Sequence, residues 1–301
     1  MSPHTAMDTV PRWPAVVAST EVFALGECPV WDPTRDRVVW VDVDAGTVHE
    51  GRLDGDQVHC TRSHKVDQTA GAVAVSPAGD LLVAGTQALL TVTTEGARLS
   101  GPVILPPGGR RLNDGACDPA GAFLVGSMTL SEEDTPGTEV LVRVERDGGL
   151  TVLDDDLTLS NGLAWSADGT VLYSIDSIPG VIWARPYDAA TGTAGPRREW
   201  LRFTDGLPDG MCVDAEDHVW VAVWGAGQVR RYAPDATLAA VVDVPAPHTT
   251  SMAFLGDRLL ITTATFGLTP EQLAEYPDSG RLFLAGTGTT GLPPAYWSGA
   301  S

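Results

Sequence analysis

A sixfold repeat of turn plus strand runs through the 301-residue sequence and limits the folds open to it. Each unit has a turn rich in Pro, Gly and Asp, followed by a short strand rich in Val, Leu, Ile and aromatic residues, which is the pattern of adjacent antiparallel strands. The predicted strands are residues 37–43, 80–86, 122–128, 170–176, 218–224 and 258–264. A helix of about two turns is predicted at 269–276, with Thr269 as its N-cap and Pro270 in its first turn.

One position, four to five residues before each turn, recurs in all six units. It is occupied by Glu27, Gly71, Asn113, Asn161, Asp209 and Thr250, at spacings of 44, 42, 48, 48 and 41 residues. Since one propeller blade takes ~40 to 50 residues, the sequence predicts an all-β fold, a six-bladed β-propeller with four-stranded antiparallel blades. Two sandwich domains would lack this single period, and a TIM barrel would need a helix after each strand.

We expect one domain over residues 1–301, with residues 1 to about 15 left open as a flexible N-terminal extension. A propeller needs its ring closed, and the extended segment 16–25 is available to add a strand to the last blade.

Charge and cysteine content narrow the partners and the compartment. Acidic residues outnumber basic ones by 39 to 19, for a net charge of -20, so the average surface would repel nucleic acid and anionic membranes, and neither is expected as a partner. No apolar run approaches the ~18 residues of a membrane helix, and the start of the chain lacks the features of a signal peptide. Four separated cysteines without a C-x-x-C pair favour a reduced, cytoplasmic protein. The oligomeric state stays open.

The recurring position carries the chemistry. The innermost strands of a propeller line its central channel, so the six equivalent residues should form a ring pointing at the axis. Glu27, Asn161 and Asp209 would bring only oxygen donors to that ring, as Ca²⁺, Mg²⁺ or Mn²⁺ prefer. Converging carboxylates repel, and a cation is the simplest compensation. Taken singly, Asn-Gly and Asp-Gly pairs are also common turn residues.

Five motifs follow one another in order between about residue 20 and the C-terminus. They are GECPVWD (26–32), RRLNDGACDPAG (110–121), SNGLAWSADG (160–169), PDGMCVDAE (208–216) and GRLFLAG (280–286). Together they resemble the senescence marker protein, gluconolactonase and luciferin-regenerating enzyme family. The resemblance implies a six-bladed propeller with one divalent metal (Ca, Zn, Mn, Mg or Fe), held by Glu27, Asn161 and Asp209. It also implies hydrolysis of sugar lactones, with Arg111 and Asn113 as substrate contacts.

The mechanism expected from these residue types is hydrolysis of a small-molecule lactone. The metal acts as a Lewis acid on the carbonyl and lowers the pKa of a nearby water, while Asp209 is general base as well as ligand. Arg111 supplies positive charge and donors, and Asn113 can donate and accept toward ring hydroxyls. The alternatives are a surface salt bridge for Arg111, a non-catalytic metal-binding or regulatory propeller, and a hydrolase of a non-sugar lactone or ester.

One segment departs from the family pattern. Family members often carry a Glu shortly after G-[ST]-M that helps to hold substrate hydroxyls, whereas here GSM is followed by TLSEEDTPG, with Ser131 at the counted position and Glu132 and Glu133 next to it. The loop 129–138 is predicted to cap the channel mouth and to tune which lactone fits. Elsewhere, the acidic run 154–156 is interpreted as a solvated turn.

Overall fold

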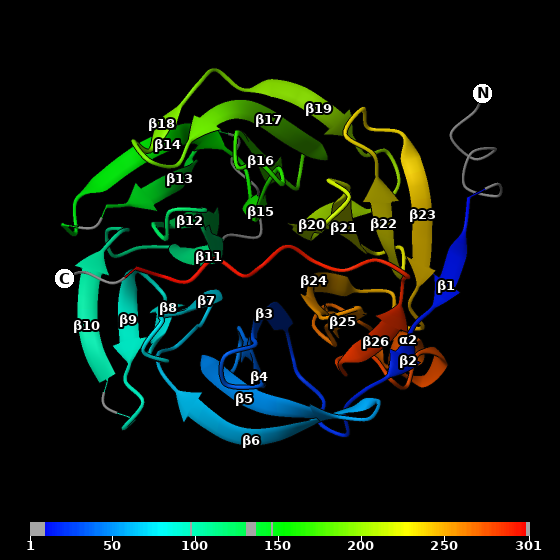
Figure 1. Cartoon of the computed structure of the whole chain (residues 1–301). Coiled ribbons are helices and arrows are strands. Elements are labelled where there is room, and N and C mark those ends of the chain that lie inside the picture. The colour runs from blue at the N-terminus through cyan, green and yellow to red at the C-terminus, as the bar shows by residue number, and fades with distance from the viewer. Residues whose placement is uncertain (1–9, 97, 131–136, 146, 299–301) are drawn as a thin grey trace.

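The strands of the computed structural model, which describes residues 10–96, 98–130, 137–145 and 147–298, form six sheets around a central axis (Figure 1). Each sheet is one blade, and its first strand lies nearest the axis. The predicted all-β, six-bladed propeller is therefore confirmed, and the blades are mostly four-stranded antiparallel sheets, as predicted.

The first three blades use consecutive strands of the chain. Blade 1 contains β3 (Gly26–Asp32), β4 (Arg37–Asp42), β5 (Thr47–Asp54) and β6 (Gln57–Lys65). Blade 2 contains β7 (Ala72–Val75), β8 (Leu81–Ala84), β9 (Ala88–Val92) and β10 (Arg98–Val103). Blade 3 contains β11 (Arg110–Cys117), β12 (Phe123–Thr129), β13 (Glu139–Val144) and β14 (Leu150–Leu157).

Blades 4 and 5 each have a fifth strand, and blade 6 takes its fourth strand from the N-terminal segment. Blade 4 contains β15 (Ser160–Trp165), β16 (Val171–Asp176) and β17 (Val181–Asp188), with β18 (Thr193–Ala194) and β19 (Arg198–Arg202) both paired to β17. Blade 5 contains β20 (Leu207–Val213), β21 (Val219–Trp224), β22 (Gln228–Tyr232) and β23 (Leu238–Asp243), with β1 (Arg12–Pro14) outside β23. Blade 6 contains β24 (Thr249–Leu255), β25 (Arg258–Thr263), β26 (Phe283–Gly286) and β2 (Val16–Val17).

The N-terminal segment closes the ring. Strand β2 pairs antiparallel with β26, with Val16 opposite Leu284, so blade 6 joins both ends of the chain. This confirms the expectation that the segment 16–25 adds a strand to the last blade. The extension predicted for residues 1 to about 15 contains strand β1, which runs parallel to β23. Residues 1–9 of this extension lie outside the described residues.

The short helix α2 (Pro270–Glu275) is where the sequence placed it. The Thr269 hydroxyl accepts a hydrogen bond from the backbone N–H of Gln272, and the Gln272 side chain accepts from the backbone N–H of Thr269. This reciprocal capping box satisfies two N–H groups that the helix itself leaves free.

The apolar core lies between neighbouring blades. Blades 3 and 4 enclose one cluster that includes Leu124 and Leu172, and blades 5 and 6 enclose another that includes Trp220 and Phe283. All four side chains are fully buried. Because each blade packs against two neighbours, this arrangement fixes the inner strands around the axis.

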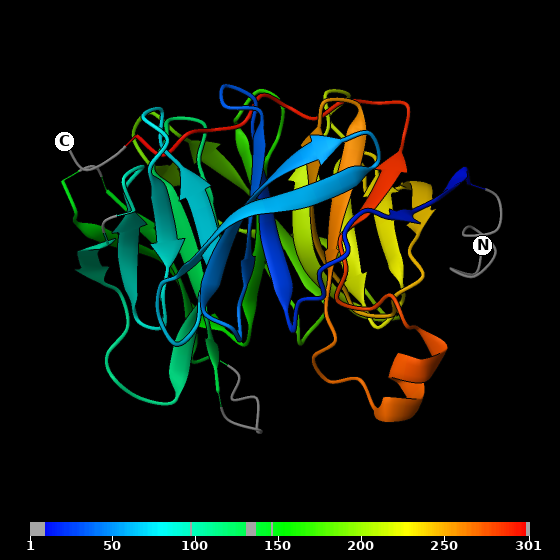
Figure 2. The same ribbon diagram turned by 90° about the horizontal axis from the view of Figure 1, so that it is seen from below.

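The two ends of the channel differ. Residues 287–298, which we call the strap, cross one end of the propeller after β26 (Figures 1 and 2). Its backbone is fixed to blade 5 by Ala215 N–H to Thr290 O (2.8 Å) and to blade 2 by Trp297 N–H to Val75 O (2.8 Å). Helix α2 lies at the opposite end (Figure 2). The inner strands begin at this end, and the recurring position lies near their first residues, so we call it the site end.

Candidate functional site

The recurring position falls at an irregularity in the pairing of five inner strands. The register with the second strand shifts at Glu27, around Asn113, at Asn161, around Asp209 and around Thr250. A β-bulge re-aims the side chain at the bulged position and bends the strand. The repeat in the sequence therefore marks where the inner strands depart from regular pleating, near their site end.

Glycines after two of these residues let neighbouring blades approach closely. A Cβ atom at Gly162 would lie 2.5 Å from the backbone oxygen of Asp209, and one at Gly210 would lie 2.3 Å from Oγ of Ser251. No other residue fits such contacts without a shift of the backbone. The Asn-Gly and Asp-Gly pairs thus serve the packing of the inner strands, beyond ordinary turn formation.

The three predicted metal ligands come together in the channel. Glu27, Asn161 and Asp209 are 8, 6 and 7% exposed. The Asn161 Nδ2 group donates hydrogen bonds to Asp209 Oδ1 and to the hydroxyl of Ser177 (3.1 Å). Both amide hydrogens are then used, and Asn161 Oδ1 is a buried acceptor without a hydrogen-bond partner.

The carboxylates of the channel destabilise one another's charge. Burial, then Asp209 and Asp114, raise the pKa of Glu27 well above its usual value. Burial and Asp114 likewise raise the pKa of Asp209 well above its usual value. Burial also raises the pKa of Asp114 to about 6. Buried carboxyls so close together keep their protons to higher pH unless positive charge is supplied.

Asp114 was missed as a site residue by the sequence reasoning. It is 9% exposed, and its Oδ1 accepts a hydrogen bond from the backbone N–H of Gly115 (2.7 Å). The signal that could have found it is its place directly after Asn113 in the motif RRLNDG, next to a ring position. A third acid in the channel increases the negative charge that a cation would neutralise.

Arg111 and Asn113 form a connected pair beside these acids. Arg111 Nη1 donates to Asn113 Oδ1 (2.7 Å) and to the backbone oxygen of Leu112 (3.0 Å). Asn113 Nδ2 donates to the backbone oxygen of Ser160 (2.9 Å), the residue before Asn161. The pair therefore links blade 3 to the ligand position of blade 4.

The alternative of a surface salt bridge for Arg111 is wrong, because the residue is 6% exposed. Burial lowers the pKa of Arg111, and the carboxylates of Asp44, Glu27 and Asp209 act against that shift. The guanidinium is thus a buried positive charge in a channel that holds several acids.

The donor set fits a hard divalent cation. Two buried carboxylates and an amide oxygen without a donor are oxygen ligands of the kind that Ca²⁺, Mg²⁺ and Mn²⁺ bind. Within the described ranges, no three side chains drawn from His, Cys, Asp and Glu are placed to hold a metal ion together. The predicted ligands include two residues of these types, Glu27 and Asp209, and their third member is Asn161.

The ring position of blade 6 has a structural role. The Thr250 hydroxyl donates to the backbone oxygen of Gly26 (2.6 Å) and so ties blade 6 to blade 1.

The loop 129–138, which is predicted to cap the channel mouth, is described only in part. Residues 131–136 lie outside the described residues, and with them Ser131, Glu132 and Glu133. Of the residues directly after GSM, the described ones are Thr129, opposite Arg110, and Leu130.

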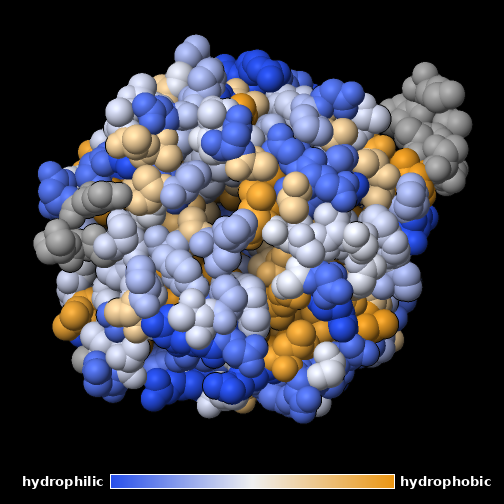
Figure 3. Space-filling model, viewed as in Figure 1, coloured by the Kyte–Doolittle hydropathy of each residue, from blue (hydrophilic) through white to orange (hydrophobic). Residues whose placement is uncertain are grey.

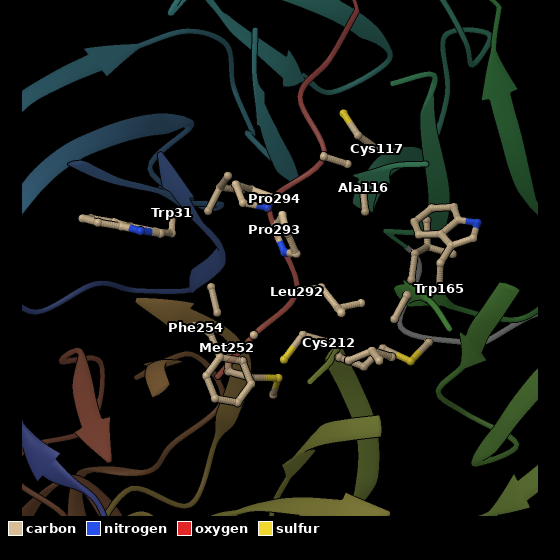
Figure 4. Close-up of a pocket in the computed structure, with 18 of the residues that line it drawn as sticks. Trp31, Ala116, Cys117, Trp165, Cys212, Met252, Phe254, Leu292, Pro293 and Pro294 are labelled. Carbon is tan, nitrogen blue, oxygen red and sulfur yellow. The ribbon is translucent and has the colours of Figure 1, made fainter. Parts of the chain in front are cut away.

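A cavity of about 640 Å³ lies beneath the strap. Its lining includes Trp31, Trp165 and Phe254, which surround the strap residues Leu292 and Pro293 (Figure 4). The surface of this face is hollowed at its centre, with apolar residues along part of the hollow (Figure 3). The lining residues follow the ring positions along the inner strands and include Asp114, so the cavity extends from the strap to the acid cluster of the candidate site.

These features define a class of protein, the β-propellers with a polar, acid-rich site in the central channel. The chain belongs to the SMP-30/gluconolactonase/LRE-like family, whose conserved region matches residues 25–265.

Named relatives share most of their length with this chain. Regucalcin of Danio rerio is 32% identical over 283 residues, which cover 91% of this chain and 95% of the relative. The crystal structure of a calcium-binding protein, regucalcin from Agrobacterium tumefaciens, has a TM-score of 0.88 at 29% identity and covers 95% of this chain and 99% of that one. A luciferin-regenerating enzyme has a TM-score of 0.86 at 25% identity, with coverage of 94% and 99%.

Among the residues that the structure describes, no helix has both the length and the apolar character to cross a bilayer.

Proposed function

We propose that this protein is a divalent-cation-dependent hydrolase that opens the ring of a lactone. The observation that carries the proposal is the Asn161 oxygen, buried without a donor beside Asp209, in a channel that also holds Glu27 and Arg111. The family name includes gluconolactonases, and one relative is described as calcium-binding. Both features agree with a cation site that serves catalysis.

Glu27, Asn161 and Asp209 would hold the cation through oxygen atoms. A bound divalent cation supplies Lewis-acid polarisation of a carbonyl oxygen and a lower pKa for a nearby water. Neutralisation of the acid cluster would also bring the raised pKa values of Glu27 and Asp209 down, which favours their ionised forms.

Asp209 is the proposed general base. It takes a proton from the attacking water while the water oxygen bonds to the lactone carbonyl carbon, and the carbon–oxygen bond of the ring then breaks. The same proton passes from Asp209 to the departing ring oxygen, which becomes the hydroxyl of the product. The net reaction adds one water to one lactone and yields one hydroxy acid.

Arg111 and Asn113 are the proposed substrate contacts. Arg111 brings a fixed positive charge toward substrate oxygens, and its Nη1 is oriented by Asn113 and the Leu112 backbone. The Asn113 oxygen already accepts from Arg111 but keeps a second lone pair for a ring hydroxyl. Together they would orient the lactone for attack.

A screen of aldonolactones with a pH indicator tests the proposal. The protein is stripped of metal and then supplied in turn with Ca²⁺, Mn²⁺, Mg²⁺ and Zn²⁺, and acid release is followed against the uncatalysed rate. We expect restored hydrolysis with at least one cation. Absence of hydrolysis for every aldonolactone would reject a sugar lactone as the substrate, and the enzyme is rejected if alkyl-substituted lactones also remain intact with every cation.

A non-catalytic cation-binding propeller is the second candidate. The description of the Agrobacterium relative as a calcium-binding protein favours it. A protein that only binds a cation has no evident use for a buried arginine beside the ligands, so Arg111 separates the two functions. The indicator screen with a parallel measurement of cation binding decides between them: binding without hydrolysis would support this second function.

A further inference from the structure

Blades 3 to 6 each expose one large apolar side chain at the site end. The exposed side chains there are Leu130 (54%), Ile178 (37%), Leu207 (36%) and Phe266 (55%). Leu130, Ile178 and Phe266 follow the ends of β12, β16 and β25, and Leu207 begins β20. In each blade these are the points where the inner pair of strands meets the site end, so we call these four residues the apolar rim.

Two rim residues are tied to the blades that carry Asn161 and Asp209. Ile178 directly follows Ser177, whose hydroxyl accepts the hydrogen bond from Asn161 Nδ2. Leu207 lies two residues before Asp209 on the same strand. Their place along the chain therefore puts both beside the proposed ligands.

The other two rim residues are tied to Arg111 and to Glu27. Leu130 N–H donates to the backbone oxygen of Gly109 (2.7 Å), two residues before Arg111. Phe266 N–H donates to the backbone oxygen of Ala24 (2.9 Å), three residues before Glu27. Four of the five proposed site residues thus have a rim residue near them, reached along the strand or across one hydrogen bond; Asn113 is the exception.

A stacked pair extends the rim between blades 5 and 6. The rings of Trp224 and His248 lie 3.9 Å apart at 16°, and His248 Nδ1 is 2.8 Å from the backbone oxygen of Phe266. Trp224 is also paired with Leu207 across the strands. The stack and the hydrogen bond fix the indole next to two rim residues, which gives the rim a rigid aromatic part.

Blade 1 contributes charge at the same end. Asp44, in the turn between β4 and β5, is exposed and interacts electrostatically with Arg111. The site end therefore combines polar groups, Asp44 at its surface and the buried Arg111, with the apolar rim on blades 3 to 6. A ligand that matches both must itself be amphiphilic.

We propose that the substrate is a lactone whose ring carries an apolar alkyl substituent, which contacts the apolar rim while the ester group faces Arg111. The inference rests on the proposed lactone hydrolysis. A polyhydroxylated aldonolactone would turn hydroxyl groups toward Leu130 and Phe266, which cannot hydrogen-bond to them, whereas an alkyl chain would remove apolar surface from water on both partners.

A series of γ-lactones with methyl, propyl and pentyl side chains tests the proposal. The cation-loaded protein is assayed for kcat/KM on each lactone and on glucono-δ-lactone. Full burial of a methylene group is worth about fourfold in affinity, so a half-exposed rim should give a rise of about twofold per methylene group. We expect the pentyl lactone to exceed the methyl lactone by about tenfold or more.

Two variants and a matched control locate the contact. Leu130→Ser and Phe266→Ser should each reduce the ratio of pentyl to methyl kcat/KM by about threefold or more. Leu99 is a control, since it is also a leucine with 54% exposure but lies on β10, the outermost strand of blade 2. Leu99→Ser should leave the ratio unchanged. Calorimetry with a γ-pentyl lactam, whose amide resists hydrolysis, gives the binding preference of metal-free protein without turnover.

The outcomes separate this inference from the proposed function. Equal kcat/KM along the alkyl series, or a preference for glucono-δ-lactone, would overturn the apolar substrate while the hydrolase stands. A rise that neither rim variant reduces would overturn the assignment of the contact. If the pentyl lactam binds better than its methyl analogue but no lactone is hydrolysed, the hydrolase and its substrate are rejected, and the apolar preference of the mouth remains supported.

Discussion

The amide nitrogen of Asn161 donates a hydrogen bond to the carboxylate of Asp209 on the neighbouring blade, which leaves the amide oxygen buried without a donor. An unpaired buried acceptor normally costs about 1 to 3 kcal/mol. It persists here beside carboxyl groups whose charged forms are also destabilised by burial. A cation would relieve both costs at once, which gives the channel a physical reason to bind one.

We predict about one tightly bound divalent cation per chain, and a loss of activity when a chelator removes it. Elemental analysis before and after chelation, with activity measured on the same samples, tests this. In Glu27→Gln, loss of one charge should weaken cation binding by at least about tenfold. The matched control is Glu50→Gln on the same blade, where the glutamate pairs with Arg37 instead. Full activity of cation-free protein would contradict the prediction.

Arg111→Ala should weaken substrate handling and leave the cation content unchanged, because Arg111 is proposed to contact substrate rather than the cation. Loss of a charge-assisted hydrogen bond predicts a fall in kcat/KM of about 10- to 100-fold. Arg258→Ala is the control, since Arg258 forms an ion pair with Asp56 at the protein surface. Kinetics and metal analysis are measured together. A variant that loses the cation would mean that Arg111 supports the ligands themselves.

The ring could be predicted from the sequence because its spacing reflects local geometry. Glu27, Asn161 and Asp209 each lie at a β-bulge, four to five residues before the next turn. Because this distance to the turn recurs from blade to blade, the repeat in the sequence aligned the three residues without knowledge of the fold. Closure by the segment 16–25 was likewise predictable, since an open propeller leaves an unpaired strand edge.

The strap could not be predicted, because residues 287–298 have no alternating pattern. It is held by backbone hydrogen bonds to Ala215, Val75 and Gly121, and such bonds leave no trace in side-chain identity. The interpretation of residues 154–156 as a solvated turn was correct for the exposure of Asp155 and Asp156 and wrong for the turn, because all three lie in β14. Asp154 forms ion pairs with Arg185 and Arg197, two arginines more than 30 residues away in the sequence.

Asp209→Asn should separate the two roles proposed for this residue. The amide keeps the shape and an oxygen donor but loses the charge and the basicity. Loss of a general base predicts a fall in kcat of about 10²- to 10⁴-fold, even at saturating cation. Glu27→Gln serves as the comparison, because excess cation should largely restore its kcat. If excess cation restores Asp209→Asn as well, Asp209 acts as a ligand alone.

The acid cluster also predicts how the stability of metal-free protein depends on pH. Burial raises the pKa of Asp114 from its usual value to about 6, so the folded state binds a proton that the unfolded state releases. The free energy of unfolding should therefore fall as pH rises between about 4 and about 6, by up to roughly 3 kcal/mol for this group. Added Ca²⁺ should oppose the fall, since the cation binds the ionised, folded form.

Asp114→Asn isolates this contribution, because its amide has no proton to lose in that range. Urea unfolding of metal-free protein at pH 4.5 and pH 7.5 gives the two free energies for each variant. We expect a smaller decrease in Asp114→Asn than in the unchanged protein, with the remainder due to Glu27 and Asp209, whose pKa values are also raised. The same decrease in both proteins would show that Asp114 is ionised in the folded channel at its usual pKa, and that the repulsion assigned to it is absent.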